Sequence, residues 1–165
     1  MARTRIAFPR WSVVMALVVT LLAAAGHLAA GDASGKTARQ VDAKVRALVA
    51  KAMAAKTPDE QQGALDAVIS LDCAAVPALG KFVGDTRPLP VRYLRLENRA
   101  KDAFESFRQY GPETLTDAVA AILNHITGQH FGSIYNGATT SERDKAVAGW
   151  REFLAHTPAE RLCGP

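Results

Sequence analysis

Histidines are the residues whose chemistry is easiest to specify in this sequence, because a neutral imidazole can ligate zinc. His125 and His130 lie close together, and His156 follows later. Zinc sites combine several closely placed His, Cys or carboxylate ligands, and the sequence contains neither an H-E-x-x-H motif nor a C-x-x-C pair. We therefore expect no catalytic, cofactor-binding or metal-ligating residues and no cofactor. The alternative is a small exported metal-dependent enzyme that uses His125 and His130.

The two cysteines, Cys73 and Cys163, are the next candidates for chemistry. In an oxidising compartment an even pair favours one disulfide, which would tie the C-terminal tail to the region of Cys73. The alternative is a buried Cys73 with a free Cys163. Because no C-x-x-C motif is present, the sequence does not support a thioredoxin-type redox site or haem attachment.

Basic and aromatic residues are mixed between Arg92 and Arg108. The basic residues are Arg92, Arg95, Arg99, Lys101 and Arg108, and the aromatic ones are Tyr93 and Phe107. Basic grooves with aromatic side chains can bind single-stranded nucleic acid, but Glu97, Asp102 and Glu105 interrupt this run. We predict a solvated, salt-bridged surface there and no nucleic-acid partner.

The segment over residues 127–136 combines Gly, Gln, His, Phe, Tyr and Asn without an obvious repeat pattern. The candidates for an interaction loop are Gln129, His130, Tyr135 and Asn136. In the structural interpretation, which we favour, Phe131 and Tyr135 anchor a connection between two helices. Gln129 and Asn136 would then satisfy backbone groups.

Residues 1–30 have the order of a secretory signal peptide. A cationic segment with three arginines precedes an uncharged apolar run over residues 11–25, and small residues follow. That run is shorter than the roughly 20 residues that span a bilayer, and we expect cleavage within residues 26–31. After removal of the leader, 17 basic residues face 16 acidic ones, because the leader holds three of the 20 basic residues and no acidic one. An uncleaved leader would instead give a membrane-tethered adaptor.

Apolar positions three and four residues apart predict a mainly helical chain after the leader. The predicted helices cover residues 36–56, 57–72, 73–83, 111–127 and 139–157. Thr57 with Glu60 forms a capping box, and either Thr139 with Glu142 or Ser141 with Asp144 starts the last helix. Pro112 is expected to start the helix over residues 111–127.

The segment over residues 91–110 is harder to assign. Pro88 and Pro90 break any helix before it, and residues 91–96 partly alternate between apolar and polar side chains. We predict an extended segment, either alone or in a hairpin, although helical spacing also fits Tyr93, Leu96 and Phe104.

Two segments carry a resemblance to a known family. Residues 65–83, LDAVISLDCAAVPALGKFV, resemble a HEAT-type repeat, in which a tight turn joins two antiparallel helices. Residues 122–154 are similar to the L-T-G-Q-x-F-G…E-R-x-x-x-V-x-x-W ending of exported bacterial HEAT-repeat-like proteins of unassigned function. The matching residues are Thr127, Gly128, Gln129, Phe131, Gly132, Glu142, Arg143, Val147 and Trp150. The resemblance implies HEAT-like antiparallel helix pairs in a small α-helical stack, and it carries over no catalytic residue.

Together these features predict one HEAT-like helical domain over residues 36–157, followed by a C-terminal tail over residues 158–165. Stacked helix pairs present a continuous surface, and the sequence assembles no reactive group. We therefore expect a non-catalytic exported protein-interaction module, periplasmic or secreted, with a protein partner. No stable membrane insertion is expected after the leader is removed.

Overall fold

The structure is a computed structural model that describes residues 34–163, so the predicted leader lies outside the described residues. The chain divides into two compact units after Arg39. Residues 34–39 are the described part of the first unit and are helical, and this helix continues to residue 53. Residues 40–163 are the described part of the second unit.

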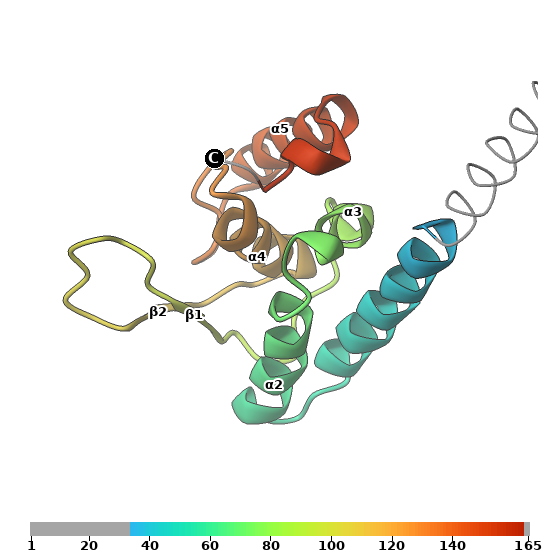
Figure 1. Cartoon of the computed structure of the whole chain (residues 1–165). Helices are drawn as coiled ribbons and strands as arrows, with labels where there is room; N and C mark the ends of the chain where they lie inside the picture. The colour runs from blue at the N-terminus through green and yellow to red at the C-terminus, as the bar shows by residue number, and fades with distance from the viewer. Residues whose placement is uncertain (1–33, 164–165) are drawn as a thin grey trace, which may run out of the picture. The chain divides into compact units, whose positions relative to one another are not determined.

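Beyond residue 53, helices alternate with short turns and one β-hairpin (Figure 1). The α-helices are α2 (Pro58–Ile69), α3 (Val76–Leu79), α4 (Leu115–Thr127) and α5 (Thr140–His156). The 3-10 helices are η1 (Asp72–Ala75), η2 (Gly80–Phe82) and η3 (Ala159–Arg161). The strands are β1 (Leu94–Glu97) and β2 (Phe107–Tyr110). The predictions of a mainly helical chain and of a hairpin near residues 91–110 are confirmed.

Side-chain caps define where the longer helices begin. The Thr57 hydroxyl accepts a hydrogen bond from the Glu60 amide at the start of α2, which places Pro58 in the first helical turn. The Glu60 carboxylate accepts from the Lys56 amide at 2.8 Å and not from the Thr57 amide, so only half of the predicted capping box forms. Thr139 and Glu142 form a reciprocal capping box at the start of α5, so each satisfies an amide that the helix leaves unpaired. Both caps follow from local sequence alone.

Helix α4 begins later than predicted. Its cap is Thr114, which exchanges hydrogen bonds with Asp117, and Pro112 lies outside the helix. The residues before Thr114 are extended instead, since the Leu89 amide donates to the Glu113 carbonyl oxygen at 3.0 Å. Gly128 ends the helix with a positive φ of 71°, as glycine readily does.

The predicted helix over residues 73–83 is broken into η1, α3 and η2. Asp72 takes a positive φ of 48°, which turns the chain sharply just after α2. The bend between α2 and the segment Asp72–Phe82 is 103°, whereas an antiparallel helix pair requires a reversal. The HEAT-like antiparallel pairing expected here is therefore not confirmed.

Helix α4 lies at the centre of the second unit, with α5 on one side and α2 and α3 on the other (Figure 1). Every residue from Leu115 to Leu123 is buried, so this helix has no solvent-facing side over its first nine residues. Trp150 of α5 and Val45 of the first helix complete the same core. A helix enclosed in this way fixes the position of the partly exposed Asn124 and His125 in its last turn.

Candidate functional site

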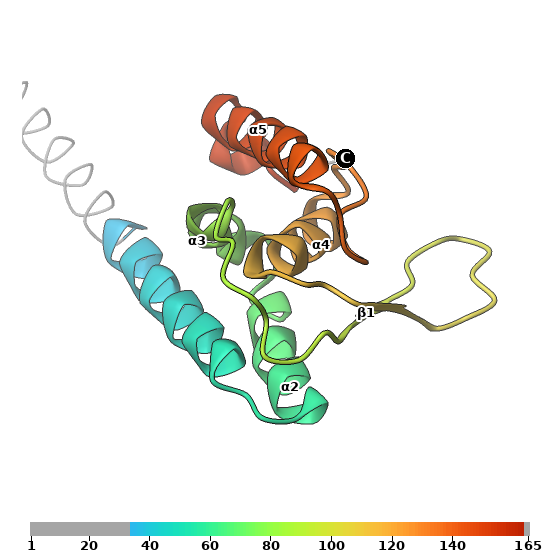
Figure 2. The same ribbon diagram turned by 180° about the vertical axis from the view of Figure 1, so that it is seen from behind.

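The β-hairpin carries two exposed phenylalanines. Strands β1 and β2 pair antiparallel, and the loop between them extends away from the helices in both views (Figure 1, Figure 2). Among residues 34–163, the exposed large hydrophobic side chains are Phe104, which is fully accessible, and Phe107, which is 50% exposed. Their place on one hairpin makes this hairpin the candidate contact surface for a partner.

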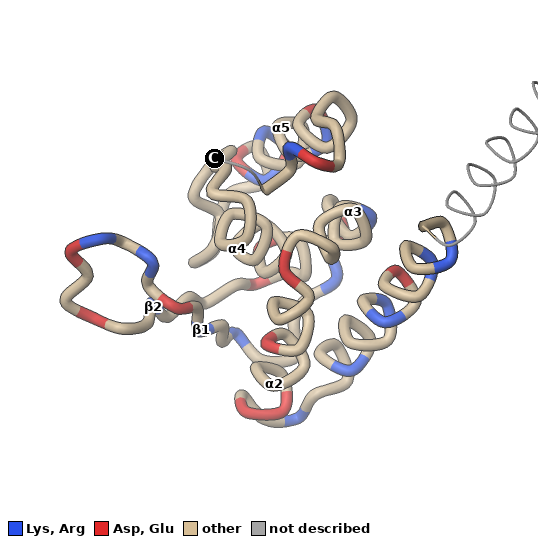
Figure 3. The backbone as a smooth tube through the Cα atoms, in the orientation of Figure 1, with Lys and Arg blue, Asp and Glu red and all other residues tan. Residues whose placement is uncertain are grey.

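Charged residues of both signs surround these phenylalanines along the hairpin loop (Figure 3). The guanidinium carbon of Arg95 lies 4.8 Å from the centre of the Phe107 ring, within the range of a cation–π contact. The side chains of Arg108 and Lys101 make no hydrogen bond or ion pair with any residue that the structure describes. The predicted solvated surface is therefore only partly salt-bridged.

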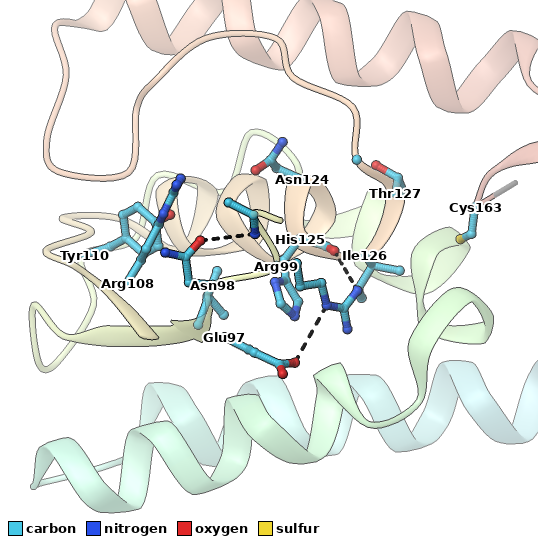
Figure 4. A pocket seen from close by; sticks show the side chains of 13 residues that line it. Glu97, Asn98, Arg99, Arg108, Tyr110, Asn124, His125, Ile126, Thr127 and Cys163 are labelled. Atoms are coloured by element: carbon cyan, nitrogen blue, oxygen red, sulfur yellow. Dashed lines mark hydrogen bonds and ion pairs between the residues drawn. The ribbon is translucent and has the colours of Figure 1, made fainter. Parts of the chain in front are cut away.

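A pocket of about 450 Å³ lies between this hairpin and the C-terminal end of α4 (Figure 4). The hairpin contributes Leu96, Arg108 and Tyr110, and α4 contributes Asn124 and His125. The pocket lining thus combines apolar and polar side chains.

Arg99 closes one side of the pocket. Its Nη1 donates a hydrogen bond to the carbonyl oxygen of His125 at 3.1 Å, and its Nε lies 3.8 Å from Glu97 Oε2. Burial, followed by the nearby Arg99 charge, lowers the pKa of His125. Both effects favour the neutral form of His125, and the Arg108 side chain adds to the lining a positive charge that pairs with no described carboxylate.

Helix α2 fixes the inner edge of the hairpin through two buried glutamines. Gln61 Nε2 donates to the carbonyl oxygens of Val91 and Tyr93, each at 2.7 Å, and Gln61 Oε1 accepts from the Val91 amide at 3.1 Å. Gln62 exchanges the same pair of hydrogen bonds with the backbone of Arg95, at 2.7 and 2.8 Å. Since these contacts are those that another strand would make, the two side chains take the place of a neighbouring strand.

Of the four candidates for an interaction loop, two are held within the fold and two are exposed. Tyr135 is buried against Tyr110, and burial raises its pKa to about 12. Asn136 Oδ1 accepts a hydrogen bond from the Gly111 amide at 2.8 Å. Gln129 and His130 are exposed, and the His130 ring lies 3.2 Å from Ser133 Oγ.

Phe131 anchors this loop on α5. Its ring meets the Trp150 ring at 4.8 Å between centres in an edge-to-face arrangement. It also lies directly over Gly149, where an added Cβ would stand 2.7 Å from Phe131 Cδ1. The sequence analysis anticipated a fold-back of Phe131 but found no role for Gly149.

A buried charge network was missed from the sequence. Arg143 of α5 donates to both carboxylate oxygens of Asp117, at 2.8 and 2.9 Å, and to Glu113 at 2.8 Å. Asp117 is completely buried, and its Oδ2 also accepts hydrogen bonds from the backbone amides of Glu113 and Thr114. Both partners raise the pKa of Arg143, Asp117 first. The E-R pair quoted in the resemblance contains Arg143, but its carboxylate partners are Asp117 in the first turn of α4 and Glu113 in the extended segment before that helix.

The two cysteines are joined in the structure. Cys73 and Cys163 form a disulfide with their Cα atoms 5.8 Å apart. It connects η1 to the segment that follows η3, and Cys163 also borders the pocket. The hairpin pocket is therefore bounded by a covalently fixed chain end.

The remaining chemistry of the described residues is limited. No three His, Cys, Asp or Glu side chains within residues 34–163 stand close enough to hold a metal ion. His125 lies in the last turn of α4 and His130 in the following loop. In the same residues no single helix has the length and apolar character to cross a membrane, although α2 passes that test jointly with the bent segment Asp72–Phe82.

Comparison with known proteins found no match to this chain. No protein-family model, no curated protein and no solved structure aligns with it significantly.

Proposed function

We propose that this chain is a non-catalytic, exported protein-interaction module and that its β-hairpin is the binding element. The observation that carries the proposal is the exposure of Phe104 and Phe107 on one projecting hairpin. Burying a fully exposed phenylalanine stabilises a complex by about 1.5–3 kcal/mol. Partners that cover both rings would therefore gain binding energy that the free chain does not use.

The surroundings of these rings favour a protein as the partner. Hot spots of protein interfaces are aromatic and arginine side chains encircled by polar groups. The hairpin offers Phe104 and Phe107 beside Arg95 and Arg108, with acidic residues in the same loop. A surface that mixes both charge signs supports a partner with its own mixed charges over a polyanion.

Export is the second part of the proposal. The leader-like residues 1–30 support it, and a disulfide between Cys73 and Cys163 is compatible with an oxidising compartment. We also propose that the helices behind the hairpin are related to HEAT-like exported proteins, as the motif over residues 122–154 suggests. In this proposal the helices hold the hairpin and the hairpin binds.

Site-specific photo-cross-linking tests the binding role. A photoreactive phenylalanine analogue replaces Phe104 in the full chain, and the matched control carries it at exposed Ala148 on α5. We expect one discrete protein adduct from position 104 in the native cell envelope and none from position 148. The purified partner should then bind Phe104→Ser at least tenfold more weakly than the unmodified chain.

Two outcomes would contradict the proposal. Equal labelling from both positions would mean that the hairpin has no special role. Absence of any adduct at position 104, with the chain folded and exported, would mean that the loop meets no partner.

A further inference from the structure

The two edges of the hairpin differ in how their backbone groups are used. In an antiparallel ladder, alternate residues point their amide and carbonyl groups toward the partner strand or away from it. The Asn98 amide donates to the Ser106 carbonyl oxygen at 2.9 Å, and Leu96 pairs with Arg108 in the same phase. The peptide groups of Phe107 and Gln109 therefore point outward from β2.

Most of the inner edge is already occupied. By the same alternation, the backbone groups of Arg95 point away from β2, and Gln62 satisfies both of them. Gln61 hydrogen bonds to the backbone of Val91 and Tyr93 in the segment that precedes β1. Among the described residues, only the peptide groups of Glu97, at the loop end of β1, are therefore left for a third strand on this side.

The outer edge is open over a defined length. Its lower end is closed, because the outward amide of Gly111 donates to Asn136 Oδ1. Among the described residues, no hydrogen bond outside the ladder uses the peptide groups of Phe107 or Gln109. Unpaired strand edges are templates for another extended chain.

We propose that the outer edge of β2 binds an extended peptide segment of the partner protein as a third strand, with an acidic side chain opposite Arg108. This inference rests on the proposed function and specifies how the hairpin would engage its partner. Backbone hydrogen bonds to Phe107 and Gln109 would supply affinity, and the alternating side chains would supply specificity.

Charge complementarity identifies the sequence pattern of that segment. Directly opposed residues on neighbouring strands share a face of the sheet. Arg108 has no described carboxylate partner and faces the pocket beside α4, so an acidic residue opposite it gains an ion pair. The adjacent residue lies on the other face, beside Phe107 and Arg95, where an apolar side chain fits.

A second copy of this chain is a poor occupant for the same reason. If two copies paired about a two-fold axis so that Phe107 of each exchanged hydrogen bonds with Gln109 of the other, Arg108 would lie opposite its own copy. Like charges directly opposed across strands are destabilising. Arg108 therefore acts against self-pairing while favouring an acidic partner.

Peptide selection provides the probe for a direct test. Random heptapeptides displayed on phage are selected against the purified full-length chain, and an enriched peptide is synthesised. We expect enriched sequences to place Asp or Glu next to an aromatic or β-branched residue. Amide hydrogen exchange should slow at Phe107 and Gln109 when the peptide binds, while the exchange of Arg108, already within the ladder, stays unchanged.

Backbone substitution then isolates the strand pairing. Gln109→Pro removes an outward N–H, and proline is accepted in edge strands at such positions; Gln109→Ala is the control that keeps the N–H. We expect the Gln109→Pro chain to bind the peptide about tenfold or more weakly than the unmodified chain does. The Gln109→Ala chain should bind it with unchanged affinity. A charge exchange tests the pairing with Arg108. We expect the Arg108→Glu chain to lose binding of the original peptide, and the unmodified chain to lose binding of a peptide in which lysine replaces the acidic residue. The Arg108→Glu chain and the lysine peptide together should bind again.

Several results would overturn the inference. These are the absence of enriched peptides, slowed exchange away from β2, or equal binding by the proline and alanine variants. If Gln109→Pro fails to fold, the exchange measurement on the unmodified chain still decides the matter. Persistence of the Phe104 cross-link in a folded Gln109→Pro chain would reject strand pairing while leaving the proposed function intact.

Discussion

Arg143 and Arg108 show how differently two regions of this molecule use the same side chain. Arg143 extends from α5 to the start of α4, where its guanidinium group binds two carboxylates and one of them, Asp117, is fully buried. Arg108 lies on the hairpin, exposed and without a described partner. Satisfied buried charges hold a fold in one arrangement, whereas an exposed unpaired charge is available to another molecule.

The largest expected effect comes from breaking the buried side of this comparison. Arg143→Ala leaves the Asp117 carboxylate buried without its cation, which typically costs about 3–5 kcal/mol. We expect this loss in the free energy of unfolding measured with urea. Arg108→Ala, the matched control, should change that free energy by no more than about 0.5 kcal/mol. Similar losses in both variants would contradict the distinction between the two regions.

Removing the disulfide should have the next largest effect. It closes a loop with a sequence separation of 90, and bridges of this kind typically contribute about 2–4 kcal/mol. We expect the double variant Cys73→Ser with Cys163→Ser to lose that amount in urea unfolding. Under conditions where this variant is folded, its affinity for the peptides selected to bind the hairpin should be unchanged. Mass spectrometry of non-reduced peptides checks the pairing, and two free thiols in exported protein would refute it.

A smaller effect is expected where the two regions meet. Gln62→Leu leaves the amide and carbonyl groups of Arg95 without partners, and each unsatisfied buried group costs about 1–3 kcal/mol. The variant should lose stability in that range, and the Arg95 amide should exchange faster. Gln129→Leu, at an exposed glutamine, is the control and should alter neither measurement. If Gln62→Leu were neutral, α2 would not be what orders the hairpin.

The smallest effect on stability is expected at the tip of the hairpin. Because Phe104 is fully exposed, Phe104→Ser removes no packing contact and should leave the midpoint of urea unfolding unchanged within error. The same variant should lose partner binding. A clear loss of stability would mean that the ring packs within the free chain, and the contrast between core and hairpin would then fail.

Local signals were sufficient for much of the architecture. The caps at Thr57 and Thr139 could be predicted because both members of each capping pair lie within one turn of sequence. The alternating burial of Leu94 and Leu96 is likewise a local pattern. The helix predicted over residues 73–83 is instead a succession of three short pieces, η1, α3 and η2. Apolar periodicity does not distinguish such a succession from one continuous helix.

The site required contacts that no local pattern carries. Gln61 and Gln62 read as ordinary polar residues of an amphipathic helix, yet their partners lie on a distant extended segment. Asp117 is a carboxylate at the start of a helix, where it accepts a hydrogen bond from the Thr114 amide. Its second role is to bind Arg143, and this role depends on where α5 packs. Conversely, the sequence predicted that the hairpin has a charged surface. It did not predict that Phe104 projects from that surface.

The contact between Phe131 and Gly149 limits how this protein can be engineered. Replacing an interior helical glycine with alanine is a standard way to strengthen a helix, worth up to about 1 kcal/mol. Here the added methyl group would overlap the Phe131 ring, and overpacking typically costs about 1–3 kcal/mol. A thermostabilisation campaign guided by helix propensity alone would therefore choose the wrong residue at position 149.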